Sequence, residues 1–167
     1  MKFYFVILLF FSTVFWGLSS CSDTGVANSD ERDIELAMHL FVQSLESGIV
    51  DSTTISLKVK QYLESKDARF FGSTVCLLDD KGKARYSPYW YRASSALAYV
   101  DLAANPSYAI NEQAWLTKPL LSGAGVWSEP YFDAGGGEIW MKTYSLPVRA
   151  NGSIIAIATT DLQVSAP

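Results

Sequence analysis

Histidine and cysteine are scarce in this sequence of 167 residues, which contains one histidine, His39, and two cysteines, Cys21 and Cys76. A lone histidine predicts neither a catalytic triad nor a histidine-based metal site, and the motifs HExxH, CxxC, GxSxG and the Walker loop are all absent. The 13 basic residues are outnumbered by 17 acidic ones and form no cluster, which argues against nucleic acid as a partner. We therefore expect no enzymatic activity, no bound metal and no cofactor.

The first 20 residues have the pattern of an export signal. Lys2 gives a positive start, and Phe3–Trp16 is an apolar run that is shorter than the roughly 20 residues a membrane span needs. Leu18–Cys21 resembles the lipobox of bacterial lipoproteins, which implies cleavage before Cys21 and lipid attached to its thiol. An ordinary secretory signal and an uncleaved N-terminal span are the alternatives.

These features predict a division into a signal peptide (1–20), a lipidated tether (21–29) and one domain (30–167). The predicted location is the cell envelope, lipid-anchored and facing the periplasm or exterior. Ser22, directly after the lipidated residue, slightly favours the outer over the inner membrane. If Cys21 carries lipid, Cys76 has no disulfide partner, and its apolar surroundings predict a buried, inert thiol.

Two amphipathic helices are predicted ahead of the strands. Apolar residues recur at helical spacing from Ile34 to Ile49, and again from Ile55 to Leu63 in a segment that Ser52 can cap. His39 falls just off the first apolar stripe, which is typical of a solvated or edge residue.

From Phe70 onward the pattern favours strands with one helix inserted among them. Ala93–Ala104 is predicted as that helix, ending before Pro106. Turns are expected at 79–82, 135–137 and 149–152. The predicted strands are Thr74–Leu78, Lys83–Tyr86, Val126–Phe132, Glu138–Val148 and Ser153–Leu162. The fold class is therefore α+β, with an antiparallel sheet of about five strands and a long N-terminal helix packed on it.

Four segments of the second half resemble a Cache domain, the PAS-like, PDC-type extracytoplasmic sensor of chemoreceptors, histidine kinases and phosphatase regulators. They are Trp127–Asp133, Met141–Pro147, Gly152 and Thr159–Leu162. The resemblance runs from about Glu31 to Leu162, and in the first half it is carried mainly by the order of helix, strand, turn and strand. It implies a PAS-like fold and a small-molecule ligand.

Amino-acid-binding Cache domains share a pattern of tyrosine, arginine, tryptophan, a later tyrosine and a final aspartate. The resemblance implies that Tyr108, Trp115, Tyr131 and Asp161 line the pocket, while Gln113 stands where the arginine is expected. Because Gln113 is neutral, the charge-assisted grip on a carboxylate is lost.

The aspartate that remains suggests an amine-bearing ligand, supported by aromatic faces. Tyr89 is expected nearby, and Arg92 is a candidate for the missing positive charge. A strand-end cap or a surface carboxylate is an equally weighted interpretation of Asp161.

The leading functional hypothesis is a ligand-binding sensor lipoprotein that has no output domain of its own. It would pass its signal to a membrane partner, such as a sensor kinase, a chemoreceptor or a phosphatase. The alternative is a ligand-free accessory subunit that packs through its long amphipathic helix.

Overall fold

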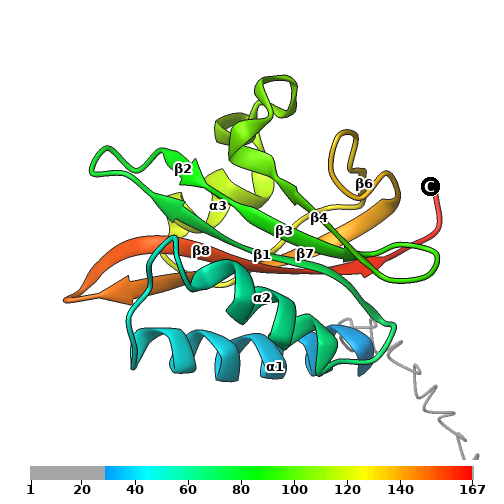
Figure 1. The fold of residues 1–167 in the computed structure, drawn as a ribbon, viewed down its shortest axis with the longest axis horizontal. Helices are drawn as coiled ribbons and strands as arrows, with labels where there is room; N and C mark the ends of the chain where they lie inside the picture. Colours follow the sequence, from blue (N-terminus) through cyan, green and yellow to red (C-terminus); the bar gives the residue numbers. More distant parts are fainter. Residues whose placement is uncertain (1–28, 167) are drawn as a thin grey trace, which may run out of the picture.

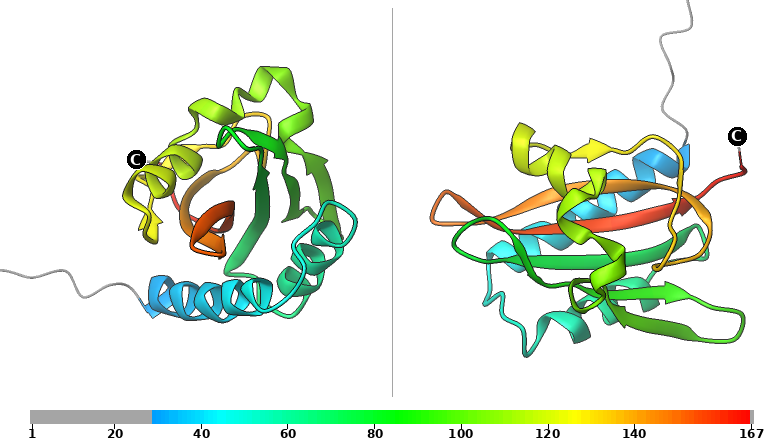
Figure 2. Two further views of the ribbon diagram at one scale, coloured as in Figure 1. Left: turned by 90° about the vertical axis from the view of Figure 1, so that its left-hand side faces the viewer. Right: turned by 90° about the horizontal axis from the view of Figure 1, so that it is seen from above.

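The computed structural model describes residues 29–166, so the expected signal peptide and Cys21 lie outside the described residues. Figures 1 and 2 show a curved antiparallel sheet with two helices, α1 and α2, on one face and α3 with short 3₁₀ turns on the other. None of the helices in residues 29–166 combines the length and apolar character needed to cross a bilayer. The expected α+β class and leading helix are confirmed.

The first helix follows the predicted apolar stripe. Helix α1 spans Ser29–Glu46, with Asp30 and Glu31 in its first turn, where the helix dipole favours negative charge. It buries one face, formed by Ile34, Met38, Phe41, Val42 and Leu45. Ile49, expected to continue the stripe, lies beyond the helix and is 76% exposed.

The second helix begins where predicted, but no side chain caps its first turn. Helix α2 spans Ile55–Glu64. The Asp51 carboxylate, rather than Ser52, accepts hydrogen bonds from the amides of Thr53 and Thr54 at 2.8 and 2.9 Å. These contacts form the turn that leads into α2, and Thr54, the residue before the helix, makes no capping hydrogen bond with its side chain, so the cap expected at Ser52 was wrong.

The sheet has eight strands rather than about five, with the order β4-β3-β1-β8-β7-β5, and β2 and β6 pair with β1 and β7. The longest hairpin joins β7 to β8 through Asn151 and Gly152, whose positive φ angles suit a tight turn. The strands are β1 (Phe70–Leu78), β2 (Ala84–Tyr86), β3 (Pro88–Arg92), β4 (Leu97–Asp101), β5 (Val126–Trp127), β6 (Tyr131–Phe132), β7 (Trp140–Ala150) and β8 (Ser153–Gln163).

The segment expected to form the inserted helix, Ala93–Ala104, instead forms a turn, strand β4 and a 3₁₀ turn. Strand β4 pairs residue by residue with β3, so sheet pairing overrides the helix preference of its alanines. The inserted helix is α3 (Ala114–Ser122), preceded by 3₁₀ turns at Leu102–Ala104, Pro106–Tyr108 and Ile110–Glu112. The single strand expected at 126–132 is divided into β5 and β6.

Both faces of the sheet are buried, and each packs in a separate hydrophobic core. On β8, Ala156 and Ala158 pack in the core beneath α1 and α2, whereas Ile157 belongs to the core beneath α3. The period of two therefore places Thr159 and Asp161 on the α3 face. Cys76 is fully buried in the α3-side core, and burial raises the pKa of its thiol to about 12, as expected for an inert cysteine.

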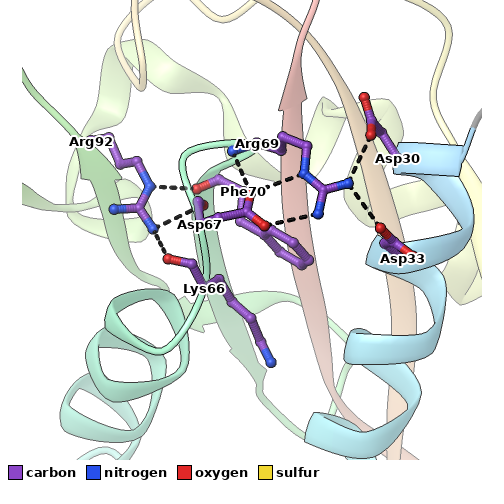
Figure 3. A network of polar contacts seen from close by, with 7 residues as sticks. All are labelled: Asp30, Asp33, Lys66, Asp67, Arg69, Phe70 and Arg92. Atoms are coloured by element: carbon purple, nitrogen blue, oxygen red, sulfur yellow. Dashed lines mark hydrogen bonds and ion pairs between the residues drawn. The ribbon is translucent and has the colours of Figure 1, made fainter.

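Two arginines fasten the helices to the sheet (Figure 3). The Arg69 guanidinium pairs with Asp30 and Asp33 of α1 and with Asp67 of the turn after α2, each at 2.8 Å. Arg92 of β3 donates to the backbone carbonyl oxygens of four residues at the end of α2 and the start of β1: Leu63, Lys66, Asp67 and Phe70. Arg92 therefore closes the C-terminal end of α2, where carbonyl groups lack helical partners.

Candidate functional site

A very small cavity lies between the sheet and α3, with a volume of about 10 Å³. A space of about 10–15 Å³ is what one water-sized group needs, so this cavity suits a group about as large as an ammonium. Strands β1, β3, β7 and β8 form its floor, and α3 and the neighbouring turns form its roof. Ten residues line it: Thr74, Tyr89, Leu102, Tyr108, Trp115, Tyr131, Asp133, Thr143, Thr159 and Asp161.

Asp161 is a buried carboxylate on the floor. It accepts hydrogen bonds from the Tyr89 hydroxyl at 2.8 Å and from the Thr143 hydroxyl at 2.7 Å. Burial, followed by repulsion from Asp133, raises the pKa of Asp161 to about 7, and the two hydrogen bonds offset only part of this effect. Near neutral pH, Asp161 is therefore poised between its protonated and ionised forms.

Asp133 supplies a second buried carboxylate from the opposite wall. The Tyr108 hydroxyl and the Gly137 amide each donate to it at 2.7 Å. The carboxylate folds back beneath its own turn, in space that Gly136 leaves open, since a Cβ at Gly136 would come within 2.1 Å of Asp133 Oδ2. Burial is the main cause of the raised pKa of Asp133. The glycines at 135–137 form the expected turn and also make room for this carboxylate.

The aromatic side chains of the cavity direct their polar tips inward. Trp115 Nε1 donates to the Tyr108 hydroxyl at 3.1 Å, and Tyr108 donates in turn to Asp133. Tyr131 and Thr143 bond through their hydroxyls at 2.8 Å. Since the Thr143 proton goes to Asp161, Tyr131 is the donor in this pair. Two hydrogen-bonded chains thus converge, each ending on a carboxylate.

The floor also requires a residue without a side chain at position 72. Gly72 of β1 lies opposite Asp161 in the β1–β8 ladder. A Cβ at this position would come within 2.3 Å of the Tyr89 hydroxyl and 2.7 Å of Asp161 Oδ2. Gly72 therefore allows Tyr89 to cross β1 and reach the carboxylate.

The cavity is acidic and lacks a balancing positive charge. Within residues 29–166, no lysine, arginine or histidine forms a salt bridge with Asp133 or Asp161. The same part of the chain contains no group of three or more histidine, cysteine or acidic side chains that could hold a metal ion. Two buried carboxylates surrounded by hydroxyl groups suit an ammonium group, because it would compensate their charge.

The structure brings together five of the seven residues singled out from the sequence: Tyr89, Tyr108, Trp115, Tyr131 and Asp161. Gln113 lies just outside, where its side-chain amide donates to the backbone oxygen of Tyr108 at 2.7 Å. Arg92 does not reach the cavity, because its guanidinium is engaged by the carbonyls at the end of α2. It therefore does not supply the charge missing at Gln113.

Sequence reasoning missed Asp133 and Thr143. Both lie inside recognised segments, Trp127–Asp133 and Met141–Pro147. Asp133 did carry a signal, because three glycines follow within four residues and leave space for a carboxylate to fold back. Thr143 carried none beyond its inward position on an alternating strand.

Comparison with known proteins agrees with this architecture. The model of the family described as methyl-accepting chemotaxis protein-like, first PDC sensor domain, matches residues 55–166. No curated protein matches the chain. Among solved structures, the extracellular domain of a histidine kinase, soHK1S-Z6, shares 28% identity with a TM-score of 0.61, covering 80% of this chain and 56% of that one.

Two chemoreceptor structures show the same fold at lower identity. The ligand-binding domain of Campylobacter jejuni Tlp3, in complex with L-valine, is 18% identical with a TM-score of 0.55, covering 81% of this chain and 54% of that one. The ligand-binding domain of Pseudomonas aeruginosa PctC, in complex with GABA, is 21% identical with a TM-score of 0.54, covering 80% and 58%. The chain thus spans little more than half the length of these domains.

Proposed function

The chain belongs to the family of methyl-accepting chemotaxis protein-like PDC sensor domains, and we propose that it senses a small amine-bearing molecule outside the cytoplasm. The observation that carries this proposal is the pair of buried carboxylates, Asp133 and Asp161, which face one cavity without a cationic side chain. An ammonium group placed there would compensate the charge that burial makes costly.

The same geometry disfavours a ligand held by its carboxylate. Gln113 is neutral, and its side-chain amide donates to the backbone oxygen of Tyr108. The Arg92 guanidinium is bound to backbone carbonyl groups away from the cavity. Asp133, which lines the cavity, would repel an anion. The L-valine of the Tlp3 structure and the GABA of the PctC structure both carry an amine as well as a carboxylate. For this chain, the amine is the group that the cavity fits.

A route from the cavity to α1 follows from adjacent residues of β8. Asp161 faces the cavity, while its neighbour Thr160 faces the other side of the sheet. The Thr160 hydroxyl lies 3.0 Å from the Tyr62 hydroxyl of α2 and 2.9 Å from the Met38 sulfur of α1. A shift of β8 on ligand binding would therefore alter the contacts of both helices and change the population of their arrangements.

Thermal unfolding of the full-length chain in detergent tests ligand binding. Methylamine at about 100 times its Kd should stabilise the fold by about 2.7 kcal/mol, which raises the Tm by roughly 5–10 °C. Acetate at the same concentration should leave the Tm unchanged. Stabilisation by acetate but not by methylamine would contradict the proposal.

Attachment to the membrane is proposed to occur through lipid on Cys21, the cysteine of the Leu18–Cys21 lipobox. Intact-mass measurement of the chain purified from a bacterial host tests it, because lipidation and cleavage change the mass together. A Cys21→Ser variant should lose the added mass and leave the membrane fraction. An unmodified Cys21 in the processed protein would contradict the anchor.

A second candidate role, an accessory subunit that binds protein rather than ligand, is favoured by one observation. Helix α1 leaves Leu36 and Leu40 64% and 60% exposed, one turn apart. If the chain binds a protein partner through this face, Leu36→Glu should abolish copurification with a cross-linked membrane sensor. The cavity variant Asp161→Asn should then have no effect on copurification.

A further inference from the structure

An open groove runs between α1 and α2, on the face of the sheet opposite α3 (Figure 2). It has a volume of about 510 Å³. Ala37, Leu40 and Phe41 of α1 supply much of its apolar lining. Phe41 stacks on Tyr62 of α2, with the ring centroids 4.3 Å apart, and this pair closes the groove toward the sheet. The groove is therefore separated by the sheet from the acidic cavity.

The charge of this α1–α2 groove is positive. Lys58 and Lys66 line it, and among the described residues of its lining none is acidic. Lys58 Nζ donates to the backbone oxygen of Ile49 at 2.9 Å, and Lys66 Nζ lies 5.3 Å from the centre of the Tyr62 ring. Both lysines are partly buried, and within residues 29–166 neither forms a salt bridge. Because a partly desolvated cation is costly without a compensating anion, the groove favours a negatively charged partner.

The spacing of the two lysines favours a helix as that partner. Lys58 lies near the start of α2 and Lys66 just beyond its end, so about 12 Å separates them along the helix axis. Two carboxylates that lie two turns apart on a partner helix span about 11 Å, whereas a fatty acid carries a single carboxylate. Leu40, which is 60% exposed, offers an apolar contact to the same helix. Grooves of this kind bind amphipathic helices through their apolar face.

We propose that the α1–α2 groove is the docking site for an acidic amphipathic helix of the protein that receives the signal. The apolar face of this helix packs on Leu40, and two of its acidic side chains pair with Lys58 and Lys66. This inference rests on the proposed function, because it names the class of partner that a sensor would address. Tyr62 links the groove to the sheet, since its hydroxyl lies 3.0 Å from the hydroxyl of Thr160 on β8.

Fluorescence anisotropy tests the docking site, with the full-length chain in phosphatidylcholine nanodiscs and no amine present. The labelled probe is a synthetic helical peptide with leucine at every third or fourth position and two glutamates two turns apart. A second peptide has glutamine in place of both glutamates. The wild type should bind the acidic peptide at least about tenfold more tightly than the neutral one. The double variant Lys58→Gln and Lys66→Gln should bind both peptides equally.

Two matched controls separate the groove from general effects of charge and apolar surface. Lys81→Gln combined with Lys83→Gln removes the same charge from exposed lysines outside the groove, and it should keep the preference for the acidic peptide. Leu40→Gln should weaken the binding of the acidic peptide at least about fivefold. Leu57→Gln should not, because Leu57 is 58% exposed on α2 but lies outside the groove.

Equal wild-type affinity for the two peptides, or binding of neither, would overturn the docking site and leave the amine cavity standing, since no amine is present. A dimer in sedimentation velocity that Leu40→Gln dissociates would assign the groove to a second copy of the chain. Protection of α1 and α2 from hydrogen exchange in phosphatidylglycerol nanodiscs alone would assign it to a lipid surface. Either assignment would overturn the proposal. Peptide binding without stabilisation by methylamine would instead overturn the amine cavity alone.

Discussion

The Tyr89 hydroxyl donates to Asp161 Oδ2 at 2.8 Å, which joins β3 to β8 across the intervening strand β1. The contact passes directly over Gly72, the position where β1 carries no side chain. One glycine in the sheet thus permits a hydrogen bond between residues that are 72 positions apart in the sequence.

Gly72→Ala should therefore damage the cavity at its floor. The added methyl group would overlap the Tyr89 hydroxyl and Asp161 Oδ2, and overpacking of this kind costs about 1–3 kcal/mol. We expect a lower free energy of unfolding in urea and a loss of methylamine binding. Gly82→Ala is the control for a loss of stability away from the cavity, because Gly82 has positive φ but open surroundings. It should lose stability while retaining affinity.

The raised pKa of Asp161, about 7, makes the stability of the free chain depend on pH. Between about pH 4 and pH 7 the folded chain holds a proton on Asp161 that the unfolded chain releases, so the free energy of unfolding should fall as the pH rises through this window. Urea unfolding at pH 5, 6, 7 and 8 measures the effect. The slope should be smaller in Asp161→Asn, and an identical slope would contradict the assignment to Asp161.

Amine binding should show the opposite trend with pH. A cation pairs with the ionised carboxylate, so methylamine affinity should increase from pH 5.5 to pH 8 as Asp161 loses its proton. Titrations in two buffers of different ionisation enthalpy should also reveal proton release on binding near pH 6.5. Affinity that is independent of pH would mean that Asp161 does not face the amine.

Arg92→Ala separates the stabilising arginine from the binding site. Loss of the guanidinium leaves carbonyl groups at the end of α2 without their donor, which should lower the free energy of unfolding by about 1–3 kcal/mol. Methylamine affinity should remain within about twofold of the wild type, a difference of about 0.4 kcal/mol. A large loss of affinity in a folded variant would show that Arg92 takes part in ligand binding.

Much of the fold was predictable because the elements near the two ends of the described chain have apolar residues at regular helical or strand spacing. The stripe of α1 and the β7–β8 hairpin with its Asn151–Gly152 turn were readable from local sequence. The middle of the chain was not. Helix α3 contains nine residues, includes Pro119 and has no side-chain cap at Gln113, so it lacks the usual signals. Its position depends on packing against β7 and β8, which local sequence does not reveal.

The site was predictable only in part, for a similar reason. The resemblance to Cache domains identified Tyr108, Trp115, Tyr131 and Asp161, which the structure gathers around one cavity. It did not identify Asp133, whose inward direction depends on a glycine turn. The sequence also could not show that Arg92 is held at the end of α2.

The measurement that tests the central claim most directly is calorimetric titration of methylamine into the wild-type chain and into Asp161→Asn at pH 8. The substitution keeps the shape of the side chain and removes its charge. The account predicts that the wild type binds and that the variant binds at least about tenfold more weakly, a loss of about 1.4 kcal/mol, while remaining folded. Equal affinity in the two proteins would contradict the claim that the buried carboxylates of this cavity recognise an amine.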